Sequence, residues 1–188
     1  MNWIYNIKNY IPYNEQEKSD KNIILSIIDN NSDILTRENK VTHITSSGYI
    51  VNKNRDKILM IFHKIYNSWS WTGGHADGDS DLLHVAIKEA IEETGVQEFT
   101  PISDEIFSLD ILPVKGHIKK GEFISPHLHL SIAYLLEANE NSTLTINEEE
   151  TKGVMWIPIN ELDKYCSEPE MLEVYKKFNE KIKNNFSK

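Results

Sequence analysis

Residues 74–96 read GHADGDSDLLHVAIKEAIEETGV, and this stretch decides the fold of the chain. Its second half is predicted to be helical. Asp79, Ser80 and Asp81 offer side-chain oxygens to the free N–H groups of a helix start, and acidic groups suit that positive end. Gly95 can take the left-handed conformation that ends a helix. Because no Gly or Pro interrupts the run between them, we expect one continuous helix.

Three carboxylates, Glu89, Glu92 and Glu93, follow the spacing i, i+3, i+4 within this predicted helix. This spacing stacks them on one face, one turn apart. Three like charges on adjacent turns repel, and a bound divalent cation such as Mg²⁺ would offset that repulsion with carboxylate ligands. An acidic helix face is more often only a solvated face, so spacing alone leaves both interpretations open.

The apolar residues of the predicted helix occupy one broad arc when successive residues are placed about 100° apart. Glu93 falls inside the edge of this arc, whereas Glu89 and Glu92 lie just beyond it, beside Val85. Partly buried carboxylates need a partner, so the arc favours bound cations over a solvated face. The arc consists of Leu82, Leu83, Ala86, Ile87, Ala90 and Ile91.

The same stretch resembles the Nudix box, whose consensus is G-x5-E-x7-R-E-U-x-E-E-x-G-U with U apolar. Counting back from Gly95 puts the first glycine of the box at Gly74. The positions that match in register are Gly74, Glu89, Ala90, Glu92, Glu93, Gly95 and Val96.

Two positions depart from the box: Ser80 stands where the family has Glu, and Lys88 where it has Arg. In the family those two side chains commonly pair as a salt bridge, so both halves of the pair differ together. Asp79 or Asp81 could partly restore an acidic partner for Lys88. The metal-binding half of the motif is unchanged.

The resemblance implies an α/β fold, a Nudix-type α/β/α sandwich with a mixed β-sheet between helices. It implies divalent-metal-dependent hydrolysis of a diphosphate linkage in a nucleoside diphosphate derivative or a related organic pyrophosphate. Mg²⁺ or Mn²⁺ would be held by Glu89, Glu92, Glu93 and the Gly74 carbonyl, and would neutralise phosphate oxygens and acidify a bound water. Glu92 and Glu93 are the expected catalytic residues. Glu150, in an acidic loop before a Trp-containing strand, is the expected general base or extra metal ligand.

Substrate contacts are expected on both sides of the box, from Trp71, Gly73 and His75, and from His127 and His129. Glycine lets the backbone approach a ligand, and an indole ring can stack on a base, with core packing of Trp71 as the alternative. His127 and His129 alternate in a predicted strand, so they share one face. They could also be zinc ligands, but no third nitrogen or sulfur ligand has an obvious spacing. Hydrogen bonding to substrate is therefore the favoured role.

The 188-residue chain is long enough for one domain with a substantial core. Its net charge of −9 argues against polymeric nucleic acid or an anionic membrane as a partner. We expect a small-molecule diphosphate partner, with metal ions neutralising its charge. One cysteine, the absence of a long apolar run and the absence of a secretory signal favour the cytoplasm. The oligomeric state is left open, and a homodimer is one alternative.

We expect residues 1–38 to form a helical N-terminal extension packed on the domain, and residues 39–188 to form the Nudix hydrolase domain with its C-terminal helix. The extension should contain a helix over Glu15–Asp29 with Ile23, Ile24, Ile27 and Ile28 as its apolar stripe. Further elements are predicted as a hairpin of strands over 44–51 and 57–63, strands over 106–115, 127–138 and 153–158, and a helix over 168–183.

Two alternatives belong to other functional classes. The chain could be a non-catalytic nucleotide-binding or regulatory domain on the same fold, although the box glutamates that such a domain could lose are present. It could also be an isomerase of isoprenyl diphosphates, which uses a catalytic cysteine in the core. Cys166 is the only cysteine and lies near the predicted C-terminal helix, which argues against an isomerase.

Overall fold

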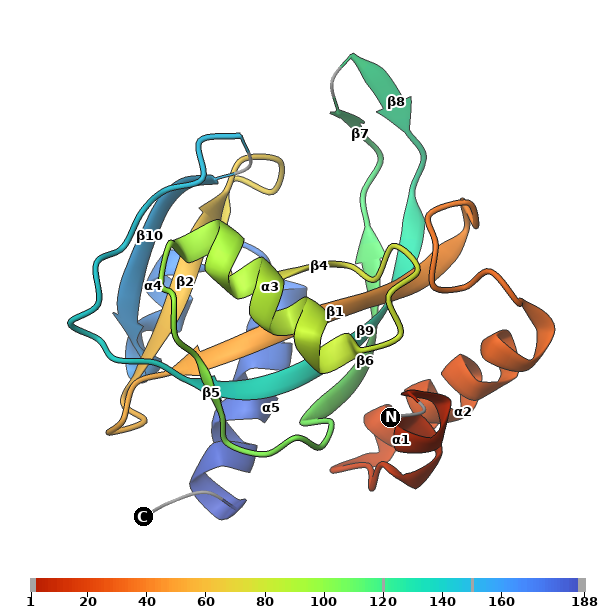
Figure 1. The fold of residues 1–188 in the computed structure, drawn as a ribbon, viewed down its shortest axis with the longest axis horizontal. Coiled ribbons are helices and arrows are strands. Elements are labelled where there is room, and N and C mark those ends of the chain that lie inside the picture. Colours follow the sequence, from red (N-terminus) through yellow and green to blue (C-terminus); the bar gives the residue numbers. More distant parts are fainter. Residues whose placement is uncertain (1–2, 120, 150, 186–188) are drawn as a thin grey trace. The chain divides into compact units, whose positions relative to one another are not determined.

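The computed structural model describes residues 3–119, 121–149 and 151–185 and shows an α/β fold (Figure 1). The helices are α1 (Trp3–Asn9), α2 (Glu15–Asn30), α3 (Leu82–Thr94), the 3₁₀ turn η1 (Ile159–Glu161), α4 (Leu162–Tyr165) and α5 (Pro169–Asn185). The strands are β1 (Thr42–Val51), β2 (Lys57–His63), β3 (Ser68–Ser70), β4 (Thr72–His75), β5 (Thr100–Pro101), β6 (Ser108–Val114), β7 (His117–Lys119), β8 (Glu122–Ile124), β9 (His127–Glu137) and β10 (Thr151–Pro158).

Hydrogen bonding orders the strands as β10–β2–β1–β9–β5, while β3, β4 and β6 pair with β2, β1 and β9 respectively. The predicted hairpin of β1 and β2 is confirmed, because the two strands pair antiparallel with Ile50 opposite Leu59. Its turn is held by Asn52, whose side-chain oxygen accepts the backbone N–H groups of Asp56 and Lys57, each at 3.1 Å. An Asn side chain that bonds its own backbone in this way is a common reason for a tight turn.

The chain divides into two compact units that are interleaved along the sequence. The first unit comprises Met1–Ser47, Gly73–Ile87 and Ser103–Tyr134, and the second comprises Gly48–Thr72, Lys88–Ile102 and Leu135–Lys188. Each is described by itself below. The division of the chain at residue 38 into an extension and a hydrolase domain stays a prediction.

In the first unit, α2 is joined to β6 through a buried carboxylate. Glu17 is fully buried and accepts hydrogen bonds from the hydroxyl of Tyr10 at 2.5 Å and from Ser108 Oγ at 2.8 Å. Ser108 Oγ also lies 2.8 Å from a carboxylate oxygen of Asp110. Burial of a carboxylate is tolerated when its lone pairs are satisfied in this way. The side chain of Asn14 caps the start of α2 by accepting the N–H of Glu17.

The predicted apolar stripe of α2 is only half correct. Ile24 and Ile28 are buried, but Ile23 is exposed and Ile27 is half-buried. The buried face of α2 also holds Glu17 and Asp20, so it is centred away from Ile23. A search for apolar periodicity could not find this face, because polar residues make up part of it.

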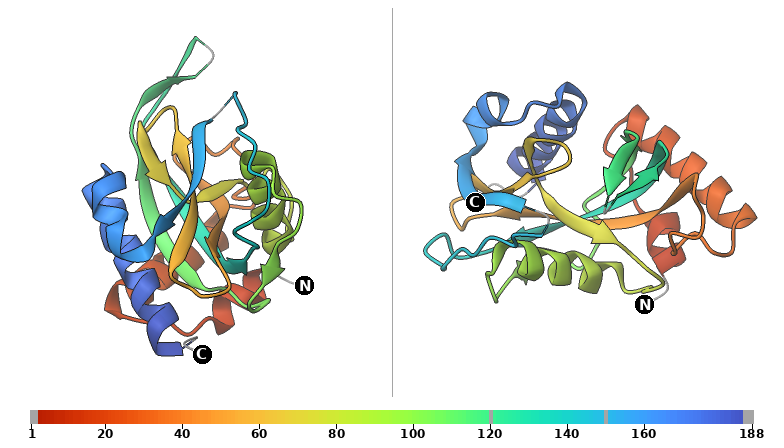
Figure 2. Two further views of the ribbon diagram at one scale, coloured as in Figure 1. Left: turned by 90° about the vertical axis from the view of Figure 1, so that its left-hand side faces the viewer. Right: turned by 90° about the horizontal axis from the view of Figure 1, so that it is seen from above.

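Two further features of the first unit concern its strands. Gly73 in β4 lies so close to β1 that a Cβ atom there would be 2.8 Å from the Cα atom of Ser47. The paired strands β7 and β8 form a hairpin that extends beyond β6 and β9 in Figure 1 and in the left-hand view of Figure 2. Its facing residues Ile118 and Phe123 are both exposed.

In the second unit, α5 packs on β1 through aromatic side chains. Tyr175 and Phe178 are fully buried and lie 6.0 and 5.0 Å from the ring of Tyr49. The Tyr49 hydroxyl donates to Asn179 at 2.8 Å. The strands β10 and β2 pair antiparallel, with Trp156 opposite Leu59. The predicted C-terminal helix and the predicted Trp-containing strand are thus present.

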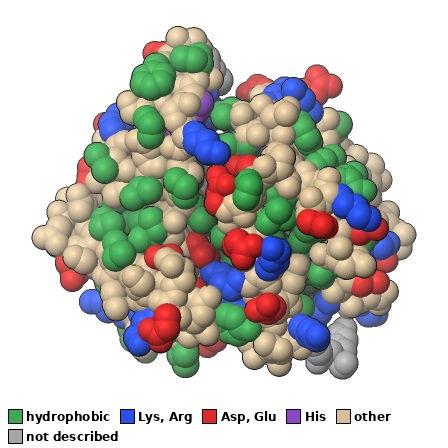
Figure 3. Space-filling model, turned by 180° about the vertical axis from the view of Figure 1, so that it is seen from behind, with side chains coloured by type: hydrophobic (Ala, Val, Ile, Leu, Met, Phe, Trp, Pro, Cys, Tyr) green, Lys and Arg blue, Asp and Glu red, His purple; other side chains and the backbone are tan. Residues whose placement is uncertain are grey.

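The surface carries charges of both signs. On the face drawn in Figure 3, acidic side chains are interspersed with lysine or arginine side chains. Among the described residues, no helix is both long and apolar enough to cross a membrane.

Candidate functional site

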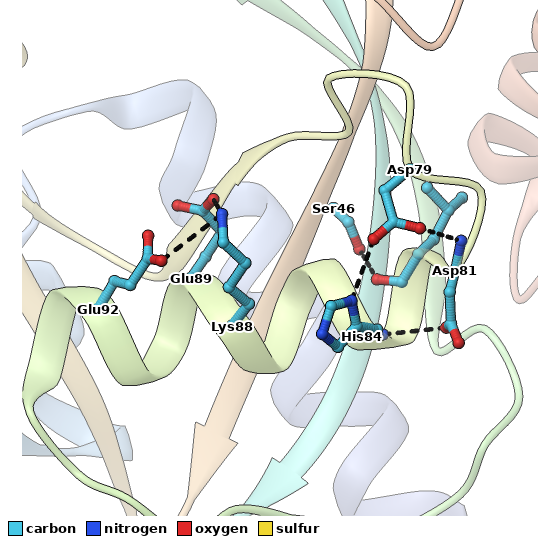
Figure 4. A network of polar contacts seen from close by, with 8 residues as sticks. Ser46, Asp79, Asp81, His84, Lys88, Glu89 and Glu92 are labelled. Atoms are coloured by element: carbon cyan, nitrogen blue, oxygen red, sulfur yellow. Dashed lines mark hydrogen bonds and ion pairs between the residues drawn. The ribbon is translucent and has the colours of Figure 1, made fainter.

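The predicted start of α3 is confirmed in the first unit (Figure 4). A side-chain oxygen of Asp81 accepts the backbone N–H of His84 at 3.1 Å, as an N-cap residue does. Asp79 accepts the N–H of Asp81 at 2.8 Å and lies 3.0 Å from Nδ1 of His84. Ser46 of β1 donates to the Leu82 carbonyl at 2.5 Å. These bonds fix the first turn of the helix against β1.

The predicted end of α3 is also confirmed, in the second unit. Gly95 has φ +74° and donates its N–H to the carbonyl of Ile91 at 2.9 Å. A Cβ atom at Gly95 would lie 2.6 Å from the Cβ atom of Thr145. Both the left-handed backbone and the close approach therefore require glycine at this position.

The buried face of α3 differs from the predicted arc. Leu82, Val85, Ala86 and Ala90 are buried, whereas Leu83, Ile87 and Ile91 are only half-buried. The face is rotated toward Val85, the side on which the glutamates lie. The prediction was wrong because it centred the arc on the largest number of apolar residues, and tertiary packing covers a neighbouring strip of the helix instead.

The three glutamates of α3, here called the glutamate cluster (Glu89, Glu92 and Glu93), have very different exposures. Glu93 is 3% exposed, the Glu89 side chain 16% and the Glu92 side chain 52%. The predicted position of Glu93 at the buried edge agrees with its burial. Glu92 reaches much further into solvent than predicted, so it can meet a ligand without any change in packing.

A single ammonium group lies between two members of the glutamate cluster. Lys88 Nζ is 3.6 Å from an oxygen of Glu89 and 3.6 Å from an oxygen of Glu92 (Figure 4). Desolvation lowers the pKa of Lys88, but the two carboxylates outweigh it, so the pKa is raised. The suggested pairing of Lys88 with Asp79 or Asp81 is not what these contacts show: Lys88 bridges carboxylates of its own helix.

Trp71 packs against α5 in the second unit. Its ring lies 5.2 Å from that of Phe178, and its backbone N–H donates to the hydroxyl of Tyr175 at 3.2 Å. These contacts agree with the alternative of core packing, and base stacking by Trp71 stays a prediction. Gly74 lies in β4 beside Gly73. Glu150 falls outside the described residues.

The histidines predicted to contact substrate belong to a larger group in the first unit. His75 of β4 and His127 and His129 of β9 gather with His43 of β1, and their ligand atoms all lie within 4.8 Å of one another. We call these four residues the histidine cluster. His43 is not among the residues predicted from the sequence. The signal that could have found it is the position of His43 near the start of a strand that neighbours β9.

Burial and mutual proximity depress the basicity of this cluster. The pKa of His75 is lowered to about 3 and that of His129 to about 2, first by burial and then by neighbouring charges. Burial also lowers the pKa of His43. These three rings are therefore neutral at physiological pH, so each offers a lone pair to a ligand.

The family model described as NUDIX domain matches residues 42–178. The chain belongs to the Nudix family. Its membership supports the prediction of a pyrophosphohydrolase, and the Nudix box identified at Gly74–Val96 lies inside the matched region. A comparison with curated proteins gave no match.

Solved Nudix structures share the fold. An Ap4A hydrolase of C. elegans, solved as a binary complex, is 19% identical with a TM-score of 0.55, covering 74% of this chain and 97% of its own. The Nudix hydrolase RenU of M. smegmatis is 12% identical with a TM-score of 0.57, covering 76% and 87%. A MutT protein of Methanosarcina mazei Go1 is 16% identical with a TM-score of 0.53, covering 78% and 99%. The mixed sheet with flanking helices is thus the predicted Nudix fold.

Proposed function

We propose that this protein hydrolyses a diphosphate linkage in a nucleoside diphosphate derivative or a related organic pyrophosphate, with Mg²⁺ or Mn²⁺ bound by the glutamate cluster. The observation that carries the proposal is the position of Lys88. A cation already lies 3.6 Å from carboxylate oxygens of both Glu89 and Glu92, so the side chains of this helix face are arranged around positive charge.

The residues present fit a hard divalent ion. Glu89 and Glu92 offer only oxygen donors, which Mg²⁺ and Mn²⁺ prefer. Lys88 is half exposed, and its long side chain can leave the carboxylates without disturbing the core. The buried carboxylate of Glu93 is the third proposed ligand. When bound, the metal supplies charge neutralisation for phosphate oxygens and lowers the pKa of a water.

The residues of the chain have separate tasks in this proposal. Glu92, the most exposed of the three, approaches the diphosphate from solvent. Glu89 is largely covered, so its carboxylate is held in one place and orients the site. Glu150, which belongs to the acidic stretch of sequence before β10, is the proposed general base that takes the proton of the attacking water. The oxygen of that water forms a bond to one phosphorus atom. The bond from this phosphorus to the bridging oxygen breaks, and the other phosphate leaves with the bridging oxygen.

A nucleotide-derived substrate is supported by the solved relatives. One of them is named an Ap4A hydrolase, and another a MutT protein. Gly73 and Trp71 are also proposed to contact the substrate. His75, His127 and His129 are proposed to contact the substrate if no metal ion occupies their ring nitrogens. The buried thiol of Cys166 suits a reducing cytoplasm, where we place the enzyme.

The experiment is a product-resolved screen. The protein is incubated with Mg²⁺, and separately with Mn²⁺, against nucleoside triphosphates, nucleotide sugars, ADP-ribose, dinucleoside polyphosphates and oxidised nucleotides. A chelator-treated sample is the control. We expect phosphate-containing products from at least one class, and none with chelator. Binding of a nucleotide without turnover would favour the non-catalytic domain instead.

A further inference from the structure

Backbone pairing gathers the histidine cluster within the first unit. Ala76 donates its N–H to the carbonyl of Ile44 at 3.2 Å, which sets His75 of β4 beside His43 of β1. Leu128 donates to the carbonyl of Val41 at 2.9 Å, which brings the start of β9 to the same end of β1. His127 and His129 alternate along β9, so they share one face. Three strands therefore deliver four imidazole rings to one place.

The spacing of the rings is that of ligands around a metal ion. Five pairs of ring centroids lie between 4.9 and 5.1 Å apart. The Nε2 atoms of His127 and His129 are 3.3 Å apart. Tetrahedral Zn²⁺ with Zn–N bonds of about 2.0–2.1 Å places neighbouring nitrogens about 3.3–3.4 Å apart. That pair already has the separation of two zinc ligands, and the ligand atoms of all four rings lie within 4.8 Å of one another.

The outer nitrogens of two rings are held by backbone carbonyls. Nδ1 of His43 lies 3.1 Å from the carbonyl of Asn39, and Nδ1 of His127 lies 2.9 Å from the carbonyl of Ser125. A carbonyl oxygen only accepts, so each Nδ1 carries the proton and each Nε2 carries a lone pair. Metal-binding histidines commonly have this arrangement, which fixes tautomer and ring orientation.

The inner nitrogen of His43 has no partner. His43 is 5% exposed, and its buried Nε2 atom makes no hydrogen bond among the described residues. A buried nitrogen lone pair without a partner loses its hydrogen bond to water and gains none within the protein. Nε2 of His127 also carries a lone pair, and it lies beside Nε2 of His129, which can donate at most one proton to it. A cation among the rings would satisfy both lone pairs at once.

We propose that the histidine cluster binds one divalent transition-metal ion of the Zn²⁺ type, which ties β1, β4 and β9 together. Imidazole nitrogen suits Zn²⁺, Cu²⁺, Ni²⁺ and Fe²⁺ and does not suit Mg²⁺. Four protein ligands close a tetrahedral shell, as in structural sites. The ion therefore has a structural role, because its ligands come from three strands and it holds them together. His75 directly follows Gly74, so the ion also fixes the backbone at the first residue of the Nudix box.

The test measures metal binding by tag-free protein, because a polyhistidine tag would bind the same ions. Chelator-treated protein is titrated with Zn²⁺ by calorimetry and with Co²⁺ by visible absorption, which is intense for tetrahedral nitrogen sites. We expect about one ion per chain and an increase in melting temperature of about 5–10 °C at a hundredfold excess over Kd. Mg²⁺ should neither produce nor displace the Co²⁺ spectrum.

Variants locate the ion. His129→Asn and His127→Asn should weaken Zn²⁺ binding by at least about 100-fold, because each removes a direct ligand. His84→Gln changes an exposed histidine outside the cluster and should bind Zn²⁺ as the wild type does. His127 is only half-buried, so its variant should fold and keep the test valid if His43→Asn does not.

Three results would overturn the proposal. Wild-type protein that takes up no Zn²⁺ or Co²⁺ at micromolar concentration has no such site. Binding that His127→Asn and His129→Asn leave unchanged lies elsewhere. Cluster variants that raise KM while the protein binds no transition metal show that the imidazoles contact the substrate. The first two results leave hydrolysis supported by Mg²⁺ at the glutamate cluster untouched, and the third requires that hydrolysis occurs, so the two proposals fail separately.

Discussion

The glutamate cluster and the histidine cluster differ in the donor atoms that they offer a cation and in the elements that supply them. The glutamate cluster offers oxygen donors from consecutive turns of one helix, and Lys88 already lies between two of them. The histidine cluster offers nitrogen donors from three strands, and the buried Nε2 atom of His43 makes no hydrogen bond within the part of the chain that the structure describes. A site whose member Glu92 is half exposed and which already holds a side-chain cation can exchange its ion, whereas four imidazole ligands from three strands are suited to keep theirs.

The largest expected effect separates turnover from folding at the glutamate cluster. Glu92→Gln keeps the shape of the side chain and removes its charge, and we expect a loss of kcat larger than about 100-fold, above the usual range for residues that act through a ligand. Glu92 is half exposed, so the melting temperature without metal should barely change. Steady-state kinetics on the substrate found by the screen measure the loss.

Glu93→Gln should lose comparable activity, but it alters a buried group that already has interactions within the protein, so its melting temperature should also fall. Glu98→Gln makes the same chemical change at an exposed position beyond the helix and should leave both quantities unaltered. Near wild-type rates for Glu92→Gln and Glu93→Gln together would remove the metal-hydrolase assignment.

The next effect is a crossed test of the two clusters. His127→Asn should lose at least about 100-fold in Zn²⁺ affinity while the concentration of Mg²⁺ that half-saturates hydrolysis stays the same. Glu92→Gln should show the reverse. Calorimetry with Zn²⁺ and rate measurements over a Mg²⁺ series give the four values. If either variant weakens both Zn²⁺ binding and the response of hydrolysis to Mg²⁺, the two clusters are coupled and do not bind their ions independently.

A third expectation concerns pH and the metal-free protein. His75 and His129 have pKa values of about 3 and about 2 when folded, against about 6.5 when unfolded. Between those pKa values the unfolded chain binds more protons than the folded protein. The free energy of unfolding therefore decreases as the pH falls below about 6.5. Above about pH 6.5 the rings contribute no pH dependence. The slope is about 1.4 kcal/mol per pH unit for each ring.

Urea unfolding between pH 4 and pH 8, with chelator present, measures this slope. His129→Asn should reduce it, because one titrating ring is removed. Glu92→Gln serves as the comparison and should leave the contribution of the histidines intact. A stability that is flat from about pH 7 to about pH 5 would mean that these rings are far more accessible to protons than their burial implies.

The smallest expected effect is at Lys88. Lys88→Gln removes the cation between Glu89 and Glu92, and exposed pairs of this kind are worth up to about 1 kcal/mol. We expect the metal-free melting temperature to drop by about 2–4 °C and the stabilisation by Mg²⁺ to grow. Thermal melts with and without Mg²⁺ test this, with Lys176→Gln as a control on the exposed pair in α5. A Mg²⁺ response smaller than that of the wild type would contradict the shared site.

The sequence predicted α3 well because the information is local. Asp81 and Gly95 lie at the two ends of the helix, and counting from Gly95 fixed the register of the glutamates. The rotation of its buried face toward Val85 was not predictable in that way, since it depends on what covers the helix. For the same reason, apolar spacing misplaced Ile23 in α2.

The histidine cluster shows the limit of local patterns more sharply. The alternation of His127 and His129 predicted a shared face, but the other two ligands come from strands far away in the sequence. Only the pairing of β1 with β4 and β9 brings His43 and His75 to that face. The spacing in the sequence therefore reveals only two of the four histidines that could bind zinc.

The buried network around Glu17 limits where this protein can be shortened. Tyr10 and Glu17 precede the sheet in sequence, yet Glu17 accepts hydrogen bonds both from Tyr10 and from Ser108 of β6. A chain that begins after α2 would lose this carboxylate and would expose the buried side chains of Ser108 and Asp110 to water. The shortened chain should therefore be less stable than the full chain, because the hydrogen bonds that join α2 to β6 are lost.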